Sequence, residues 1–522
     1  MTKANSSRGG QRSTTSLVLA SVIAMSISGT ALADTTDQLL DQLKAKGILT
    51  KAEYQKLKAR HQAELEQKAT EAPAPAGHRL VTKEGVVIVP EDRYLTRLDK
   101  GIGAHIGAVD VKLSGELIFF GSEQFKQVGQ TLCGPNPCVA GGLGGSSTVN
   151  NSNSIRSGLL PSSLVLNIST NQLGYDIGFT LGLYTGGNSA NVGLLNANNG
   201  GAPFGLSTPG IDLRQVFGTI GTPEFGTVKI GRDLGLFGAD AILNDFTLFG
   251  VGTPSANAAP ANTSLGRIGI GYVYADWIPQ VTYTTPNFYG FTASIGAFTP
   301  YNEFNVAGPF VAPVGFGVNP FSGTMSAHDQ PQIQARLKYV GQLTPDLKLT
   351  AWTDGITQQH RAETEPGGVD AGLVLLAPGT NTRAFGVDGG ARLDWGPVSV
   401  AAYGYYGAGL GTTGLFWNGI SFDGNKRLSS GFYAEGEYTF YDTFTLGASY
   451  GASYLRGNWI DYSPFFGNGQ LVGSNSSVIG FGRYKLTDWV SFQGEYIHSL
   501  SRNLVGGGIS SDAFVLGTTF FF

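Results

Sequence analysis

The sequence predicts an all-β fold, a closed antiparallel transmembrane β-barrel of about 16 strands (roughly 16–18), preceded by a short α-helical segment. Beyond residue 100, polar and apolar residues alternate with a period of two in one segment after another. The connections between these segments are alternately short and long. No window supplies the roughly 20 apolar residues that a membrane-spanning helix needs, so a chain that crosses a membrane here must cross it as strands.

The composition agrees with many short strands joined by turns. Glycine accounts for 77 of 522 residues and aromatic residues for 11%, whereas charged residues make up only 14%. The charged fraction of an average soluble protein is about 25%. The net charge of -4 is too acidic for a general nucleic-acid-binding protein, so no nucleic-acid partner is expected.

Residues 1–33 have the pattern of a secretory signal peptide. Arg8 and Arg12 precede an apolar stretch at 16–27, and the Ala-Leu-Ala run at 31–33 fits the small-x-small rule for cleavage. The apolar stretch is too short and too rich in serine to span a bilayer. We therefore expect an exported protein.

The two cysteines, Cys133 and Cys138, lie in one Gly/Pro-rich run. In an oxidising compartment we expect them to form a short loop disulfide, with two free thiols as the alternative. No histidine or second cysteine pair is near them in the sequence, so we expect no zinc site. We also expect no other metal and no cofactor.

The segment 34–72 is rich in Leu, Lys, Glu and Gln and poor in Gly. Leucines at helical spacing and a stop at Gly47 predict a first helix, and Thr50 with Glu53 forms a capping box for a second. This segment, which we expect in the periplasm, either packs as a small coiled coil with neighbouring subunits or is a frayed helix without a partner. Residues 73–100 are predicted to be a linker and the barrel entry.

The barrel itself is predicted at 101–522. In the run 332–339, four polar residues face one side and four apolar residues face the other, and 432–440 and 490–496 alternate in the same way. Single-chain bacterial barrels have an even number of strands, and about 16 strands leave an aqueous lumen. The predicted strands are 105–120, 161–171, 173–185, 211–221, 225–232, 277–285, 288–299, 331–340, 346–357, 383–394, 397–408, 430–440, 443–455, 475–485, 488–499 and 512–522.

The connections and the aromatic residues favour a membrane barrel over a soluble sandwich. Tight turns such as 343–346 and 486–488 alternate with long Gly/Asn/Ser-rich loops such as 187–209, which is the pattern of periplasmic turns and outer loops. Aromatic residues at strand ends would form girdles at the two membrane interfaces. They include Trp352, Trp395, Tyr438, Phe440, Tyr484, Trp489 and Tyr496.

Three sequence runs resemble the Gram-negative general porin family. They are 212–217 (Asp-Leu-Arg-Gln-Val-Phe), 224–232 (Glu-Phe-Gly-Thr-Val-Lys-Ile-Gly-Arg) and 281–294, which contains Thr-Pro-Asn-Phe-Tyr-Gly. The terminal Phe522 matches as well. The leucine-rich segment before the barrel is not part of that pattern and is similar to the N-terminal extension of some substrate-selective porins, of the phosphate or dicarboxylate type.

The resemblance implies a homotrimer and a long loop after the fifth strand, at about 233–276, that folds inward and narrows the pore. It implies that acidic loop residues face basic residues of the wall, and that Phe520 and Phe522 signal to the barrel-assembly machinery. The expected loop residues are Asp233, Asp240, Asn244 and Asp245; the expected basic wall residues are Arg214 and Arg232. Alternation alone adds the wall residues Arg336, Lys338, Arg392, Glu435 and Glu437.

The residues and the resemblance together indicate an outer-membrane porin through which small hydrophilic solutes and ions diffuse passively, in contact with membrane lipids and lipopolysaccharide. One alternative is a porin selective for anionic solutes such as phosphate or dicarboxylates. Another is a structural barrel that tethers the cell envelope. We expect no enzymatic activity, because the six histidines are scattered and no nucleophile-elbow motif occurs.

Overall fold

The structure is a computed structural model in which the chain divides into two compact units, 1–76 and 77–522. The residues that it describes are 44, 49–60, 77–82, 85–90, 95–98, 101–129, 139–145, 151–185, 211–254, 257, 263–302, 305, 325, 327–362, 376, 379–463 and 469–522. The predicted signal peptide, the Cys133–Cys138 disulfide and most of the leucine-rich first helix lie outside these residues.

In the first unit, residues 51–60 form a helix that begins with the predicted capping box. The Glu53 N–H donates to the Thr50 hydroxyl oxygen at 3.3 Å, and the Thr50 N–H donates to the Glu53 carboxylate at 3.0 Å. Hydrogen bonds from the hydroxyl and the N–H of Thr50 lower the pKa of the Glu53 carboxyl group. Tyr54 is buried, with the Lys44 ammonium group 4.1 Å from its ring centroid. A coiled-coil partner for this helix stays a prediction.

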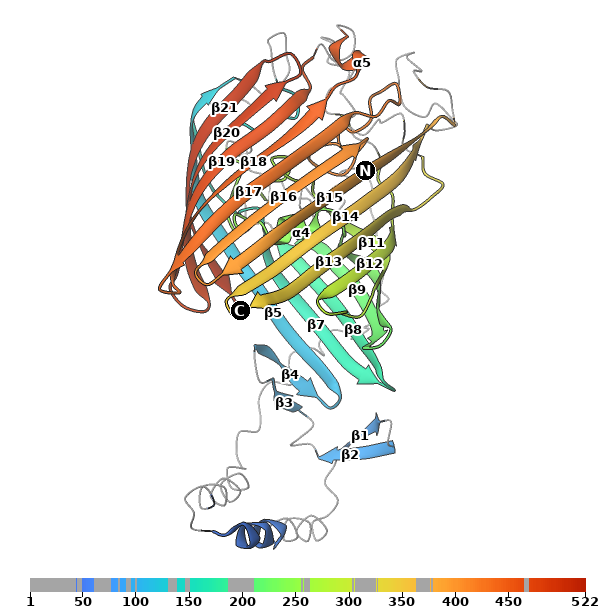
Figure 1. Ribbon diagram of the computed structural model, residues 1–522, viewed down its shortest axis with the longest axis vertical. Helices are drawn as coiled ribbons and strands as arrows, with labels where there is room; N and C mark the ends of the chain where they lie inside the picture. Colours follow the sequence, from blue (N-terminus) through green and yellow to red (C-terminus); the bar gives the residue numbers. More distant parts are fainter. Residues whose placement is uncertain are drawn as a thin grey trace, which may run out of the picture. The chain divides into compact units, whose positions relative to one another are not determined.

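In the second unit, sixteen antiparallel strands of the described chain form a closed barrel (Figure 1). The last strand pairs with the first to close it. Each predicted strand overlaps an observed one, so the predicted fold class is confirmed. The strands are β5 (Val109–Val128), β7 (Ser162–Gln172), β8 (Tyr175–Thr185), β9 (Ile211–Thr222), β10 (Gly226–Leu234), β11 (Trp277–Thr284), β12 (Phe291–Phe298), β13 (Gln332–Thr344), β14 (Leu347–Arg361), β15 (Asn381–Trp395), β16 (Val398–Ala408), β17 (Leu428–Phe440), β18 (Phe444–Arg456), β19 (Val472–Lys485), β20 (Val490–Asn503) and β21 (Gly508–Phe521).

The structure contains five short strands besides these sixteen. β1 (Gly77–Thr82), β2 (Gly85–Pro90) and β3 (Leu95–Arg97) lie in the segment predicted as linker and barrel entry, β4 (Ile102–Ile106) overlaps the start of a predicted strand, and β6 (Ser152–Arg156) lies in the connection after β5. The predicted strand 105–120 is divided, because a turn at Gly107, with a φ of 63°, separates β4 from β5. β4 pairs with the first residues of β5, which extend beyond the end of β21, so the β3–β4 hairpin widens the sheet there.

The wall alternates apolar residues on the outside with polar residues on the inside, as the period of two predicted. On β20, Phe492 and Tyr496 are exposed on the outer surface, whereas Gln493 and Glu495 are buried. Most of the expected girdle residues are exposed as well, namely Trp395, Tyr438, Phe440, Tyr484, Trp489 and Tyr496. Trp352 is an exception and its assignment to the girdle is wrong, because it is buried and packs on the ring of an inward-facing tyrosine, Tyr403.

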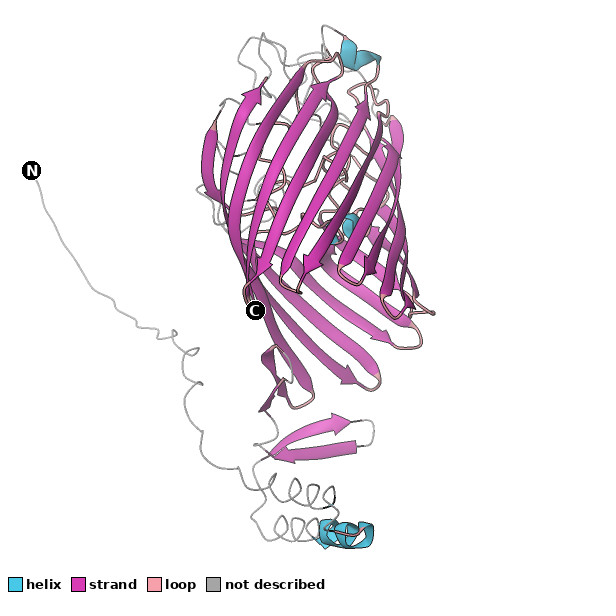
Figure 2. Cartoon of the chain, turned by 60° about the vertical axis from the view of Figure 1, so that its left-hand side comes forward, coloured by secondary structure: helices cyan, strands magenta, loops and turns pink. Residues whose placement is uncertain are grey.

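The connection between β10 and β11, residues 235–276, folds into the barrel and is called the constriction loop below. It contains the short helix α4 (Ala239–Leu243), which the strands surround (Figure 2). Phe237, Ile268 and Val273 of this loop are fully buried, in a hydrophobic cluster that includes inward-facing residues of the wall. The loop is therefore packed against the barrel interior as a small core of its own.

At the long-loop end of the barrel lies a single helical turn, α5 (Trp459–Tyr462) (Figure 1). A buried, bidentate ion pair ties it to the connection between β16 and β17: Arg427 meets Asp461 at 2.6 and 2.8 Å. Among the described residues, no helix has both the length and the apolar character needed to cross a bilayer.

Candidate pore and constriction loop

Four inward-facing side chains of the wall, here called the anchor row, accept hydrogen bonds from backbone N–H groups of the constriction loop. They are Gln334 on β13, Asp388 on β15, Glu435 on β17 and Glu495 on β20. Their order around the wall follows the order of the loop residues that they hold, from 236 to 252. The first half of the loop therefore crosses the inner wall from β13 to β20, with an oxygen acceptor at each step.

The first two anchors hold the start of the loop. The Gln334 side-chain oxygen accepts from the N–H groups of Leu236 and Phe237 at 2.7 and 2.8 Å. Asp388 accepts from the Gly238 N–H at 3.0 Å. Gly238 has a φ of 76°, and a Cβ at this position would lie 2.7 Å from a backbone oxygen of the returning part of the loop. A glycine is therefore needed both for the backbone conformation and for the close approach.

The last two anchors hold the loop beyond α4. One oxygen of Glu435 accepts from the Phe246 N–H at 2.8 Å, and the other accepts from the Ser449 hydroxyl at 2.8 Å. Glu495 accepts from the N–H groups of residues 251 and 252 at 2.9 and 3.2 Å. Both carboxyl groups are nearly fully buried, so they satisfy backbone donors that water does not reach. Glu435 faces inward as predicted, but the loop covers it.

Tyrosine hydroxyl groups reinforce the same contact. Tyr433 donates to the carbonyl oxygen of Ala241 in α4 at 2.8 Å, and Tyr403 donates to Asp388 at 3.0 Å. The two rings stack with their centroids 5.4 Å apart. The inner wall under the loop is thus an aromatic surface with its polar atoms turned to the loop backbone.

A second set of inward-facing groups, here called the ionic row, lies nearer the short turns. It consists of Arg336 and Lys338 on β13, Arg392 and Asp394 on β15, Glu437 on β17, Arg483 on β19, and Asp240 of the loop. Asp240 accepts from Arg336 at 3.0 Å and also pairs with the Lys338 ammonium group. The structure thus brings the expected loop acid and two of the expected wall bases into direct contact.

The rest of the ionic row supports the underside of the loop at Phe246. Arg483 pairs with Glu437 and also donates to the carbonyl oxygen of Phe246 at 3.4 Å. The Arg392 guanidinium lies 4.8 Å from the centroid of the Phe246 ring and pairs with Asp394 at 2.8 Å. Each of these bases therefore contacts a carboxylate and the loop together.

Asp240 and Glu437 are more deeply buried than the bases that they meet, whereas Arg392 and Asp394 are about equally exposed. The Asp240 side chain is 1% exposed, whereas those of Arg336 and Lys338 are 22% and 27% exposed. Glu437 and Arg483 are 12% and 24% exposed. The row holds four bases and three acids. The part of this site that solution reaches is consequently basic, and such a surface attracts anions.

The expected charges on β9 and β10 lie outside the ionic row. Arg214 is buried and pairs at 2.9 Å with Asp212 of its own strand. Asp233 belongs to β10 rather than to the loop, and it pairs with Lys229 of the same strand. In both pairs the carboxylate is neutralised by a base of its own strand, so neither carboxylate contributes to the ionic row.

Arg232 also departs from the expected arrangement. Its cross-strand neighbours are Val216 and Pro279, and both are exposed on the outer side of the barrel. Asp233, the next residue, faces inward, where its carboxylate accepts from Gln215 at 3.0 Å. The structure therefore does not group Arg232 with the other expected wall bases.

The remaining expected loop residues shape the loop itself. The Asn244 amide donates to the Asp240 carbonyl oxygen at 2.8 Å, at the end of α4. The buried Asp245 carboxylate accepts from the Thr247 N–H at 2.8 Å and from the Tyr272 hydroxyl at 3.0 Å. Among the described loop residues that we expected to face wall bases, Asp240 alone pairs with them.

The chain end lies where the barrel closes. The Phe522 carbonyl oxygen accepts from the Gly115 N–H at 3.0 Å, and the Phe522 N–H donates back at 3.1 Å. Its ring lies 6.2 Å from that of Trp489, and Phe520 is exposed on the outer surface. Recognition of Phe520 and Phe522 by the assembly machinery stays a prediction.

Several site residues were absent from the sequence prediction. Asp388 and Asp394 share the inward-facing parity of Arg392, so alternation along the strand could have identified them. Arg483 could have been found in the same way on β19. The anchoring role of Gln334 had no sequence signal, because its partners are backbone N–H groups far away in the chain.

Several solved structures match this fold. The outer membrane channel DcaP of Acinetobacter baumannii matches with 13% identity and a TM-score of 0.55, over 82% of this chain and 99% of that one. An anion-selective porin from Comamonas acidovorans has 15% identity and a TM-score of 0.48, over 79% and 100%. OmpF of Salmonella typhi, in complex with daunomycin, has 12% identity and a TM-score of 0.45, over 81% and 100%.

No protein-family model and no curated protein sequence matches the chain. The closed barrel of sixteen strands and the match to DcaP along nearly the whole of that channel therefore define it by its fold. The chain has a porin-like fold, a closed antiparallel β-barrel of sixteen strands.

Proposed function

We propose that this chain forms a water-filled channel in the bacterial outer membrane, through which small hydrophilic solutes and ions diffuse passively. The observation that carries the proposal is the ionic row, a set of partly exposed charges on the inner wall of a closed barrel. Such charges are costly inside a membrane unless water reaches them. A polar solute can replace part of its hydration shell with these groups, whereas an apolar solute gains nothing from them.

The test is single-channel recording of the purified protein in planar lipid bilayers. We expect stable, ohmic current steps in potassium chloride. The folded state should be verified by its heat-dependent mobility on a denaturing gel. Folded protein that inserts and carries no current would overturn the proposal and would favour a barrel that tethers the envelope.

A second candidate is a channel selective for anionic solutes, and one observation favours it. In the ionic row four bases are partly exposed, and the acids Asp240 and Glu437 are more deeply buried than the bases that they pair with. A small dianion such as phosphate or a dicarboxylate could pair with Arg336 and Lys338 on β13, or with Arg483 on β19, through the exposed parts of these side chains.

This candidate is tested by the reversal potential in a salt gradient. Anion selectivity predicts a reversal potential close to the equilibrium potential of chloride, and a reduced chloride current when phosphate or succinate is added. A general diffusion channel predicts a small reversal potential and the same current with glucose, phosphate or succinate at equal ionic strength.

We also propose that the short turns and segment 34–72 lie on the periplasmic side and that three chains associate. The long connections would then face outward, as is usual for such barrels. Current steps that open and close in groups of three, together with a cross-linked trimer on a gel, are the expected results. Single independent steps and a monomeric band would contradict the trimer.

A further inference from the structure

A cavity of about 250 Å³ lies inside the barrel near the short turns, under the constriction loop. Side chains of four adjacent strands, β18 to β21, line it together with one residue of the loop. Its volume suits one small organic solute. The residues that carry the argument are Phe249, Phe521, Arg483, Lys485, Gln493 and Asp442.

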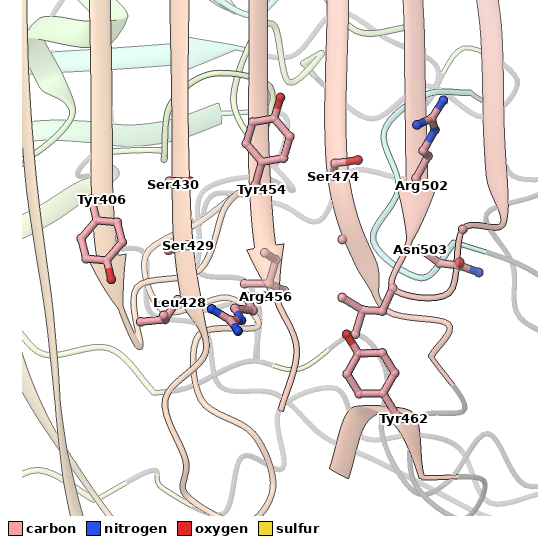
Figure 3. A pocket seen from close by; sticks show the side chains of 14 residues that line it. Tyr406, Leu428, Ser429, Ser430, Tyr454, Arg456, Tyr462, Ser474, Arg502 and Asn503 are labelled. Atoms are coloured by element: carbon pink, nitrogen blue, oxygen red, sulfur yellow. The ribbon is translucent and has the colours of Figure 1, made fainter. Parts of the chain in front are cut away.

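The cavity faces the lumen and not the membrane. On β19, Arg483 and Lys485 are two residues apart and share the inward side, and their register partners on β20, Gln493 and Ser491, line the same cavity. A larger groove on the outer wall, at the opposite end of the barrel, shows the contrast (Figure 3). Its residue Tyr454 is exposed on the outer surface, where a solute in the lumen does not reach it.

The anchor row fixes the position of Phe249 at the cavity. Glu435 and Glu495 hold the loop backbone three residues before it and two residues after it. The preceding residue, Leu248, is buried in the core of the loop, whereas Phe249 is only partly buried. Its ring meets that of Phe521 edge to face, with the centroids 5.4 Å apart. The two rings thus form an apolar corner of the cavity that a third ring could join.

The polar part of the cavity holds two bases and one acid. Arg483 keeps Glu437 and a loop carbonyl as partners. Lys485 pairs at 2.7 Å with Asp488 of the turn after β19, and the two side chains are 52% and 90% exposed. So exposed an ion pair is weak, and a solute carboxylate can replace Asp488 at small cost. Asp442 also borders the cavity and would repel a second negative charge on the solute.

We propose that this cavity binds an aromatic monocarboxylate, with its ring against Phe249 and Phe521 and its carboxylate on Lys485. A dianion fits less well because of Asp442, and a small aliphatic acid leaves the two phenyl rings without an apolar partner. A lipid chain does not reach the cavity, since the barrel wall separates it from the membrane. Solution enters from the short-turn end, where Lys485 is half exposed, so the inference goes beyond the proposed channel and does not require that it conducts.

The test is the binding of three fluorinated probes to the folded full-length protein in detergent, followed by fluorine NMR with the uptake by detergent alone subtracted. The probes are 4-fluorobenzoate, which has both the ring and the carboxylate, and 4-fluorobenzyl alcohol and fluoroacetate, which each lack one of them. We expect 4-fluorobenzoate to bind about fivefold more tightly than either of the others, because it alone makes both contacts. Equal binding of the three probes would overturn the proposal.

Two variants separate the two contacts. Phe249→Ser should remove most of the preference for 4-fluorobenzoate over fluoroacetate, because the ring of the probe loses its apolar partner. Lys485→Gln should remove most of the preference over 4-fluorobenzyl alcohol, because the ammonium group is lost. Lys485 is half exposed, so its variant tests the site even if Phe249→Ser weakens the fold. Both preferences unchanged in Lys485→Gln would also overturn the proposal.

Leu243→Ser and Lys348→Gln are the matched controls. Leu243 is an exposed apolar residue of the same loop, and Lys348 is an exposed lysine near the short-turn end of β14. Neither lines the cavity, so both preferences should stay the same. Single-channel recording of the same samples separates the two proposals. A barrel that binds 4-fluorobenzoate without conducting would remove the channel and leave the cavity site, whereas a conducting barrel that does not distinguish the probes would remove the cavity site alone.

Discussion

The anchor row and the ionic row lie on the same inward-facing side of the barrel wall, at successive levels along the strands. They differ in how the constriction loop contacts them. Glu435 and Glu437 are only two residues apart on β17. Glu435 is buried and accepts a hydrogen bond from the loop backbone, whereas Glu437 pairs with a partly exposed arginine. The constriction loop causes the difference, because its backbone covers the anchor row, whereas the ionic row meets the loop only at Asp240 and Phe246 and stays partly exposed.

The comparison shows that a charge inside a barrel need not belong to the pore. A buried acceptor that satisfies backbone donors contributes to stability, since its loss leaves those donors without a partner. A partly exposed ion pair contributes little to stability, because water can replace either partner. We therefore expect variants of the anchor row to change stability first, and variants of the ionic row to change ion selectivity first.

The largest effect is expected at Glu495. Replacing it with alanine leaves the N–H groups of residues 251 and 252 without an acceptor, which should lower the free energy of unfolding by about 3 kcal/mol. Urea unfolding followed by tryptophan fluorescence measures the change. Proteolysis of the intact barrel should cleave the constriction loop faster.

Glu495→Gln is the control for this prediction, because an amide oxygen can still accept from residues 251 and 252. Its new NH₂ group would face Gln493, whose amide can turn to accept from it. The glutamine variant should therefore keep most of the stability. If the glutamine and alanine variants lose stability equally, the carboxylate charge and not the acceptor geometry holds the loop.

An intermediate effect is expected at Asp240, the residue that joins the two rows through the loop. Asp240→Asn leaves Arg336 and Lys338 without a carboxylate. Both bases are partly exposed and can be hydrated, so the stability loss should be about 1 kcal/mol. The reversal potential should move toward that of chloride, because the net charge of the site rises by one unit. An unchanged reversal potential would show that the ionic row does not line the path that ions take.

The smallest effect is expected at Glu437. Glu437→Gln should change the free energy of unfolding by less than about 1 kcal/mol, because Arg483 keeps its contact with the loop carbonyl. The reversal potential should move in the same direction as in Asp240→Asn. A stability loss as large as that of Glu495→Ala would break the distinction between the two rows.

The alternation of residues along β13 was enough to place Arg336 and Lys338 on the inner wall, because a strand turns every second side chain to the same face. The same rule failed for Trp352, since the pattern cannot tell an aromatic residue of the membrane girdle from one that packs under an inward loop. It also missed the turn at Gly107, where a short hairpin joins the sheet edge below the closure point.

The sequence by itself predicted a closed barrel of about sixteen strands and, on strands such as β13 and β17, which residues face inward. Only the tertiary structure decided that the Glu435 and Asp245 side chains are buried while the Arg483 side chain is partly exposed to solvent. The physical reason is range. Alternation is a local property of an extended chain, whereas burial inside the barrel depends on where a loop of distant residues lies. This loop is held through its backbone N–H groups, which every residue except proline has, so the residue types do not reveal the contacts.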